Sequence, residues 1–217
     1  MPRAPDPRLR ERLLAAAVRV FARAGYAAAT LDAIAAEAAV TKGGIYFHFR
    51  GKEELFFAAL DSVRAAERAA IQEPRALEAT GAGELVAVIA AWLGFQFMET
   101  GAARLLGLLA GEVSDRPTAR IRADPREDLR ALRARLRQAL VRGVSDGTLD
   151  VRDPVLCAFL LAAGARGIVA QWLAAPADVA EFGSAAELAE ALVEPLRTHA
   201  PPAEGGAAPG FLPRVDA

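Results

Sequence analysis

Apolar residues recur every three to four positions along most of this 217-residue chain, which is the period of amphipathic helices. The first such stripe is formed by Leu14, Val18 and Phe21, and it predicts a helix over residues 8–24. Gly25 follows directly and has the residue type that favours a helix end. A longer helix is predicted over residues 52–71 by the same kind of spacing, with Phe56, Leu60 and Val63 on its inward face.

Between these helices the pattern predicts two short helices joined by a tight turn. Thr30 is a suitable N-cap for the first, whose apolar stripe is Leu31, Ile34 and Ala35. Residues 38–40 interrupt the periodicity, and Thr41 can cap a second helix over residues 42–49. This is the helix-turn-helix pattern, whose second helix enters the major groove of DNA.

The composition of the second short helix strengthens this interpretation. Gly43 and Gly44 each cost roughly 1 kcal/mol in a helix relative to Ala, which a purely structural helix has little reason to accept. Ile45 and Phe49 are four residues apart and are predicted to point inward. Tyr46, Phe47 and His48 cannot all share that inward face, so at least two of these three rings must face outward. The alternative is a buried aromatic cluster with solvated Lys42 and Lys52 at its ends.

The rest of the chain predicts an all-α fold of about nine helices. It is rich in Ala, Leu and Arg. Helices are expected at residues 84–100, 102–113, 154–174 and 184–198, and a long Arg-rich helix is expected to end near residue 143. Two apolar helices at the end of the chain exceed what one small body can bury, so we expect a homodimer with two-fold symmetry. Its interface residues are predicted to be Gly164, Gly167, Leu188, Leu192 and Leu196.

Charge is divided unevenly along the chain. Residues 1–52 carry a net charge of +5 and the remainder carries −6, which suits a protein that binds phosphates at one end. The single Cys157 favours a reducing, cytoplasmic setting. No signal peptide is expected, because no sufficiently long apolar run follows the arginines at the N-terminus. No membrane span is expected either, because Arg166 and Gln171 interrupt the most apolar stretch, residues 155–173, which is better explained as a buried helix.

The sequence shows no constellation typical of an enzyme. His48 and His199 lie far apart, and there is no Cys/His metal spacing, phosphate loop or serine elbow. We therefore expect no catalytic residues, no metal and no cofactor.

The helix-turn-helix region contains a recognisable set of residues: the run from Thr41 to Phe49, the segment Lys52-Glu53-Glu54-Leu55, and upstream Phe21, Gly25-Tyr26, Thr30, Ile34 and Ala35. Together they resemble the signature of the TetR (tetracycline repressor) family. The resemblance covers roughly residues 8–57. The run is also similar to the γ-butyrolactone receptor branch, although the same run occurs across the wider family. The resemblance implies a bacterial transcriptional regulator, and in particular a repressor released from an inverted-repeat operator in double-stranded DNA by a small effector.

Site residues follow from the resemblance. It implies that DNA is contacted by Thr30, Thr41, Lys42, Gly43, Gly44, Tyr46, Phe47, His48 and Lys52. Phe47 departs from the family, in which a second tyrosine is common. The implied effector is mostly apolar, and it would lie among Leu60, Ile89, Trp92, Leu93, Gln96, Leu105, Leu108, Leu136 and Phe159, unless these residues simply fill a core.

The expected organisation is a disordered arm over residues 1–7, a DNA-binding domain over 8–52, a ligand-binding and dimerisation domain over 53–199, and a disordered tail over 200–217. Two other functions stay open. One is a helical small-molecule-binding or enzymatic protein that has lost DNA binding. The other is a nonspecific architectural DNA-binding protein, which should lack a ligand cavity and a palindromic preference.

Overall fold

The computed structural model describes residues 7–72, 80–99, 101, 104 and 127–198. Within these ranges the chain is all-α, as predicted, with nine α-helices, a short 3-10 helix and an isolated bridge between Leu149 and Arg197. The elements are α1 (Pro7–Ala28), α2 (Leu31–Glu37), α3 (Lys42–His48), α4 (Lys52–Ala70), α5 (Gly81–Met98), α7 (Glu127–Ser145), α8 (Pro154–Ala174), α9 (Pro176–Ala180), α10 (Ala185–Val193) and η2 (Glu194–Leu196).

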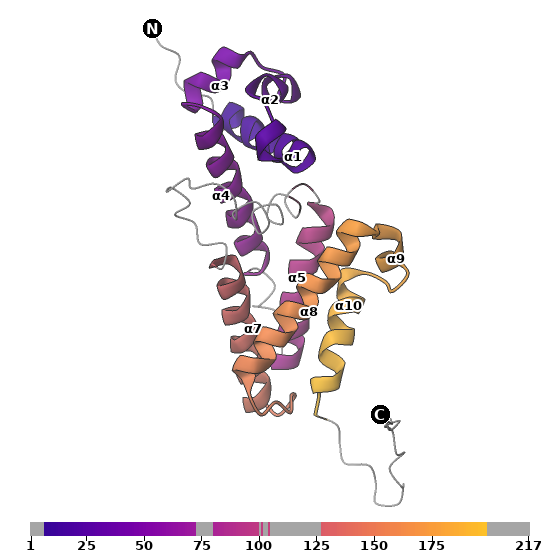
Figure 1. Cartoon of the computed structure of the whole chain (residues 1–217). Coiled ribbons are helices and arrows are strands. Elements are labelled where there is room, and N and C mark those ends of the chain that lie inside the picture. Colours follow the sequence, from indigo (N-terminus) through magenta and orange to yellow (C-terminus); the bar gives the residue numbers. More distant parts are fainter. Residues whose placement is uncertain (1–6, 73–79, 100, 102–103, 105–126, 199–217) are drawn as a thin grey trace, which may run out of the picture.

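The helices form a small head and a larger body (Figure 1). Helices α1, α2 and α3 make the head, and α4 leads from the head to the body, where α5, α7, α8 and α10 pack together. The expected helix at residues 102–113, the arm up to residue 6 and the tail from residue 199 lie outside the described residues.

Side-chain caps explain where several helices begin. The Oγ1 atoms of Thr30 and Thr41 accept hydrogen bonds from the N–H groups of Ala33 and Gly44, at 3.1 and 3.3 Å. Asp153 caps α8, which has Pro154 in its first turn. Ser184 caps α10, and the Ser184 N–H donates in return to the Glu187 carboxylate. The caps predicted at Thr30 and Thr41 are therefore confirmed.

Some helix ends differ from the expected positions. Gly25 has a positive φ of 72° and a non-helical ψ, so the regular helix is interrupted there, although a further turn continues to Ala28. Helix α10 ends at Val193 rather than near residue 198, because Pro195 has no N–H to donate and forces a 3-10 turn. The sequence pattern did not predict α9, which is only five residues long.

Two separate hydrophobic cores hold the molecule together. The head core is built from α1, α2 and α3 with the first half of α4, from Leu55 to Val63. The body core begins at Ile71 and includes the inward faces of α5, α7, α8 and α10. Helix α4, with Ile71 directly after its last residue, therefore links the two cores, and a change in its direction would move the head relative to the body.

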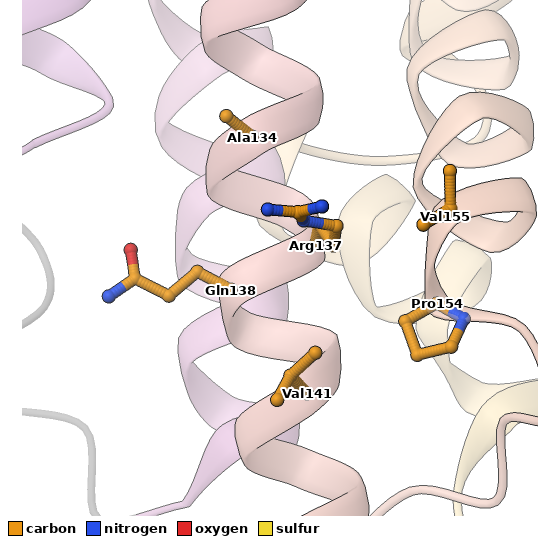
Figure 2. A pocket seen from close by; sticks show the side chains of 6 residues that line it. All are labelled: Ala134, Arg137, Gln138, Val141, Pro154 and Val155. Atoms are coloured by element: carbon orange, nitrogen blue, oxygen red, sulfur yellow. The ribbon is translucent and has the colours of Figure 1, made fainter.

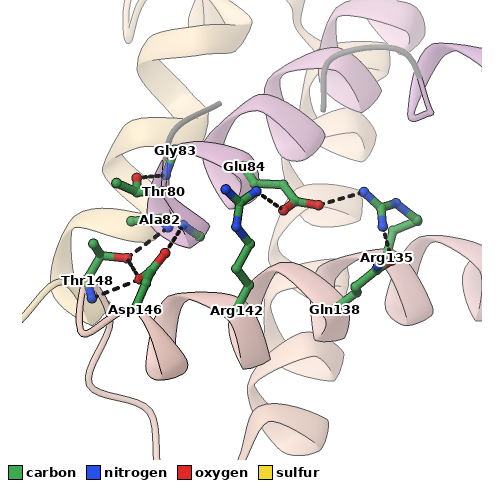
Figure 3. Close-up of polar contacts among 10 residues, drawn as sticks. Thr80, Ala82, Gly83, Glu84, Arg135, Gln138, Arg142, Asp146 and Thr148 are labelled. Atoms are coloured by element: carbon green, nitrogen blue, oxygen red, sulfur yellow. Dashed lines mark hydrogen bonds and ion pairs between the residues drawn. The ribbon is translucent and has the colours of Figure 1, made fainter. Parts of the chain in front are cut away.

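A cluster of ion pairs and hydrogen bonds holds α5 against α7 (Figure 3). The buried Glu84 carboxylate pairs with Arg135 at 2.8 Å and with Arg142 at 2.9 Å. Burial opposes ionisation of Glu84, but the hydrogen bonds and charges of the two arginines outweigh it and hold the pKa of this carboxyl below its usual value. Asp146 accepts the N–H of Gly81, and the backbones approach so closely that a Cβ on Gly81 would lie 2.1 Å from the Gly143 nitrogen.

Helix α8 is less buried than predicted. Both α5 and α8 are long and apolar enough to cross a membrane by length and composition, but such a test is also passed by core helices. Half of the apolar window of α5 is buried inside the body, whereas only 28% of that of α8 is. The exposed apolar side chains of α8 include Val155, Leu156, Phe159 and Leu160.

Candidate nucleic-acid interface

Helix α3 presents two large rings to solvent. Ile45 and Phe49 are buried in the head core, as their four-residue spacing predicts. Tyr46 and Phe47 are 53% and 58% exposed on the opposite side. A short helix that leaves two aromatic side chains in water has an outer face suited to contact with another molecule.

The two glycines of α3 are not required by packing within the chain. A Cβ on Gly43 would meet nothing closer than the Thr41 Oγ1 at 3.8 Å, and one on Gly44 would meet the Val40 Cβ at 3.7 Å. Both distances are ordinary van der Waals contacts, and both residues have helical backbones. The fold itself would thus accept alanine, which favours an external reason for the small side chains, such as close approach of a partner.

Lys42 is held by a charge partner on α2. Its Nζ lies 2.9 Å from the Asp32 Oδ2, and both side chains are solvent-accessible. The hydrogen bond and the charge of Asp32 raise the pKa of Lys42, so the ammonium stays protonated at neutral pH. The cation at the start of α3 is therefore preserved, and an exposed ion pair of this kind is weak enough to exchange its partner.

Lys52 at the start of α4 is folded back onto the head. Its Nζ donates to the Ala27 carbonyl at 3.0 Å and lies 4.6 Å from the centre of the Tyr26 ring. The side chain thus joins the end of α1 to the start of α4. To reach a phosphate, it would have to release this carbonyl.

His48 is half-buried, and its Nε2 atom is buried without a hydrogen-bond partner. Its ring packs edge-on against Phe47, with 5.3 Å between the ring centres. Thr30 and Thr41 use their oxygens as caps, but each hydroxyl retains its proton for donation to another acceptor. Thr30 and Thr41 directly precede α2 and α3, and His48 is the last residue of α3.

Arginines of α1 brace the helix-turn-helix and were not singled out by the sequence pattern. Arg12 donates to the Ala38 carbonyl at 2.9 Å, and the Arg10 guanidinium lies 5.6 Å from the centre of the Phe49 ring. Arg19 pairs with Glu37 at 2.7 Å, which lowers the pKa of that carboxyl through a hydrogen bond. Their partners are 18 to 39 residues away, so sequence spacing gave no signal for these contacts.

The residues proposed for the effector are divided among several places. Leu60 lies in the head core, whereas Ile89, Leu93 and Leu136 lie in the body core. Trp92 and Gln96 are buried and both donate to Glu67 on α4. Leu105 and Leu108 lie outside the described residues.

Phe159 is exposed and lines a groove between α7 and α8. Figure 2 shows another part of this groove. Two adjoining hollows of about 560 and 540 Å³ run along this groove, and Arg137, Ala134 and Val155 line both. The Arg133 guanidinium lies 5.7 Å from the centre of the Phe159 ring. Phe159 therefore lines a surface groove and does not face the body core.

The residues proposed for the subunit interface also have contacts within the chain. Leu188, Leu192 and Leu196 are partly buried and pack against the body core. A Cβ on Gly164 would lie 3.6 Å from the Leu192 Cδ2, whereas one on Gly167 would meet nothing within 4 Å. The exposed large apolar side chains of α8 are instead Val155, Leu156, Phe159 and Leu160, none of which was predicted to lie at the interface.

Cys157 shows no sign of a reactive thiolate. Burial and the nearby Asp153 charge both raise the pKa of its thiol. The thiol therefore stays protonated at neutral pH, which is unfavourable for nucleophilic or redox chemistry.

Comparison with known proteins identifies the head. Residues 13–59 match the family described as bacterial regulatory proteins, tetR family. The transcriptional regulator SrpR of Pseudomonas putida is 49% identical over 53 residues, which are 24% of this chain and 25% of that protein. Curated relatives are matched over only 18–40% of their own length, so these sequence matches concern the head.

Solved structures extend the likeness to the body. One, described as the molecular basis for control of antibiotic production by bacterial hormones, has a TM-score of 0.70 and 27% identity over 89% of this chain and all of its own. The reduced form of NemR from E. coli has a TM-score of 0.68 and 27% identity, covering 88% of this chain and 97% of its own.

These matches agree with the lack of an enzyme motif in the sequence, because the family is one of regulators and not of enzymes. They also agree with the observed order of elements, a helix-turn-helix head followed by a helical body. The head, residues 13–59, therefore belongs to the TetR family of bacterial transcriptional regulators.

Proposed function

We propose that this protein binds an inverted-repeat operator as a homodimer and represses transcription until a small effector releases it. The observation that carries the proposal is the outer face of α3, where two exposed rings stand beside two glycines that the fold does not need. Such a helix can approach base pairs closely in the major groove.

Each residue of this surface has a role in the proposal. Gly43 and Gly44 allow the backbone to approach DNA, while Tyr46 and Phe47 contact the groove wall. Lys42 and Lys52 would exchange their present partners, Asp32 and the Ala27 carbonyl, for phosphates. The cap hydroxyls of Thr30 and Thr41 and the ring of His48 would donate to the DNA backbone.

The exposed apolar face of α8 supports dimerisation. Its apolar residues continue with small ones, Ala163, Gly167 and Ala170, along the same side of the helix. A second copy related by a two-fold axis would cover this face and bring two α3 helices to the same side of the dimer. Two symmetric reading heads require a palindromic site with half-sites about one helical turn, or a multiple of it, apart.

The effector is proposed to be small and mostly apolar, and to bind within the body near Trp92 and Gln96. The likeness to the structure concerned with bacterial hormones supports an effector of that general kind and the γ-butyrolactone receptor branch. A ligand that binds about a hundredfold better to a conformation with wrongly spaced heads supplies about 3 kcal/mol, which is within the usual range for coupling between sites.

The test is binding to the intergenic DNA beside the gene, compared with random DNA of equal length. Tyr46→Ala should weaken binding to the intergenic fragment more than to random DNA, because the ring helps to position α3. Phe182→Ala is the control, since Phe182 is exposed on the body, beyond α9. Equal binding of the wild-type protein to both DNAs would contradict operator recognition.

The competing function is a helical binding protein that has lost DNA recognition. Immobilised genomic fragments at low salt separate the two, because such a protein would not be retained. Retention that is abolished by Tyr46→Ala, but not by Phe182→Ala, would exclude it.

A further inference from the structure

Helix α4 changes character between the two cores. Its residues from Leu55 to Val63 pack in the head core, and Ile71, just after the helix, packs in the body core. Between them lie two buried charged side chains, Arg64 and Glu67, which are 4% and 6% exposed. The junction of head and body is therefore polar, although it is shielded from water.

Glu67 joins this junction to α5 by two short hydrogen bonds. The indole Nε1 of Trp92 donates to the Glu67 Oε1 at 2.6 Å, and the Nε2 of Gln96 donates to the same oxygen at 2.7 Å. Both donors are buried, at 6% and 3% exposure. Two α5 side chains one helical turn apart thus hold one carboxylate oxygen of α4.

Such a contact is directional in a way that apolar packing is not. A hydrogen bond weakens steeply when its angle or length changes, whereas apolar side chains can slide over one another with little loss. A bond to a charged acceptor in a water-poor site is also stronger than a neutral one. If α4 tilts away from α5, both buried donors lose their acceptor, and an intermediate tilt is disfavoured.

We propose that Glu67 is the positioning residue that fixes the DNA-binding head relative to the body, through Trp92 and Gln96. The inference rests on the proposed function, in which the spacing of the two heads decides DNA affinity. The two hydrogen bonds to Glu67, which we call the Glu67 joint, define the DNA-competent direction of α4. Any effector that separates α4 from α5 must break these two bonds.

Two further contacts between head and body, within the described residues, are apolar. Phe95 of α5 packs against the head core, and a Cβ on Gly101 would lie 3.5 Å from the Val18 Cγ1 of α1. Contacts of this kind tolerate sliding, so they keep the head attached without setting its angle. The Glu67 joint sets the angle between the head and the body.

The test measures the angle directly, by the distance between nitroxide labels on the head and the body. Ala36→Cys on α2 and Ser145→Cys at the end of α7 are both exposed, and Cys157→Ser removes the native thiol. Dilution with unlabelled protein isolates the distance within one chain. The wild-type background should give one narrow distance distribution.

Glu67→Leu should broaden or shift this distribution while circular dichroism shows the helices intact, and should lower affinity for intergenic DNA about tenfold. Glu67→Gln keeps an acceptor oxygen at the same place and should restore the wild-type distance. Asp61→Leu removes an exposed carboxylate from the same helix and should change nothing.

A folded Glu67→Leu protein with the wild-type distance distribution would overturn the proposal, as would a broadened distribution with unchanged DNA affinity. If Glu67→Leu does not fold, Trp92→Phe and Gln96→Leu remove one donor each and carry the same expectation. The distance measurement needs no DNA. A wild-type protein that shows the joint but fails to bind DNA would therefore contradict the proposed function alone.

Discussion

Lys52 makes a structural contact within the head and is also proposed to bind a DNA phosphate. Its ammonium is bonded to the Ala27 carbonyl and packed over the Tyr26 ring, so it closes the gap between α1 and α4. The long side chain starts at the first residue of α4, close to the end of α3. Because an ammonium group on a flexible side chain can exchange one oxygen acceptor for another, a nearby phosphate could replace the Ala27 carbonyl as the partner of Lys52.

Lys52→Ala separates the two roles. If Lys52 contacts a phosphate, the variant should bind specific and random DNA more weakly by a similar factor, and the salt slope should fall by about one unit. Binding measured between low and moderate salt gives this slope. Arg152→Ala, an exposed body variant, should leave it unchanged. A lowered melting temperature with an unaltered slope would assign Lys52 a structural role only.

Individual residues were predictable where local spacing decides their direction. The i, i+4 relation of Ile45 and Phe49 was enough to place both inward, and the caps at Thr30 and Thr41 follow from hydroxyl chemistry. The Lys42–Asp32 and Lys52–Ala27 contacts were not predictable, because their partners come from other helices. Such partners depend on how the head folds in three dimensions.

The turn between α2 and α3 contains a strained residue. Ala39 has a positive φ of 54°, and it is the one non-glycine residue with positive φ in the described part of the chain. A Cβ in the left-handed region costs roughly 1–2 kcal/mol, which glycine avoids. The helix-turn-helix therefore forms in spite of an unfavourable residue at its centre.

Ala39→Gly should stabilise the protein by up to about 1 kcal/mol, because the relief of strain exceeds the additional unfolded-state entropy of glycine, about 0.4–1 kcal/mol. Urea unfolding measures the change. Ala36→Gly is the matched control: it lies inside α2 and should destabilise by about 1 kcal/mol. Destabilisation by both substitutions would show that the turn is not strained at Ala39.

Whole elements were predicted well where apolar periodicity and caps agree, as for α2 and α3. Their ends were less predictable where a single residue overrides the pattern. The leucine spacing continues past Val193, but Pro195 cannot donate its backbone and ends α10 early. Helix α9 is too short to show a period, so no pattern could reveal it.

For the whole molecule, the sequence indicated two domains and an apolar C-terminal half but not which surfaces stay uncovered. Leu188 and Leu192 were assigned to a subunit interface by their spacing, yet both pack partly against the body core. The same spacing serves either purpose, and only the position of α5 shows which side of α10 faces inward. The exposed side of α8 is therefore the better candidate for the centre of a dimer.

Leu160→Arg is the sharpest test of this interface. Leu160 is 58% exposed, so the substitution disturbs no buried packing within one chain, but it would place a charge in an apolar dimer contact. We expect sedimentation velocity to show monomers with unchanged helical content and strongly reduced affinity for an inverted-repeat site. Leu192→Arg is a poorer choice, because it would also damage the body core.

Val144→Arg provides the control for Leu160→Arg. Val144 is an exposed apolar residue of α7, outside the apolar face of α8, so this variant should sediment as the wild-type protein does. If Leu160→Arg also remains a dimer, α8 does not form the interface. If both variants become monomers, added positive charge alone disrupts association. Only dissociation confined to Leu160→Arg supports a dimer in which α8 pairs the two heads for adjacent half-sites.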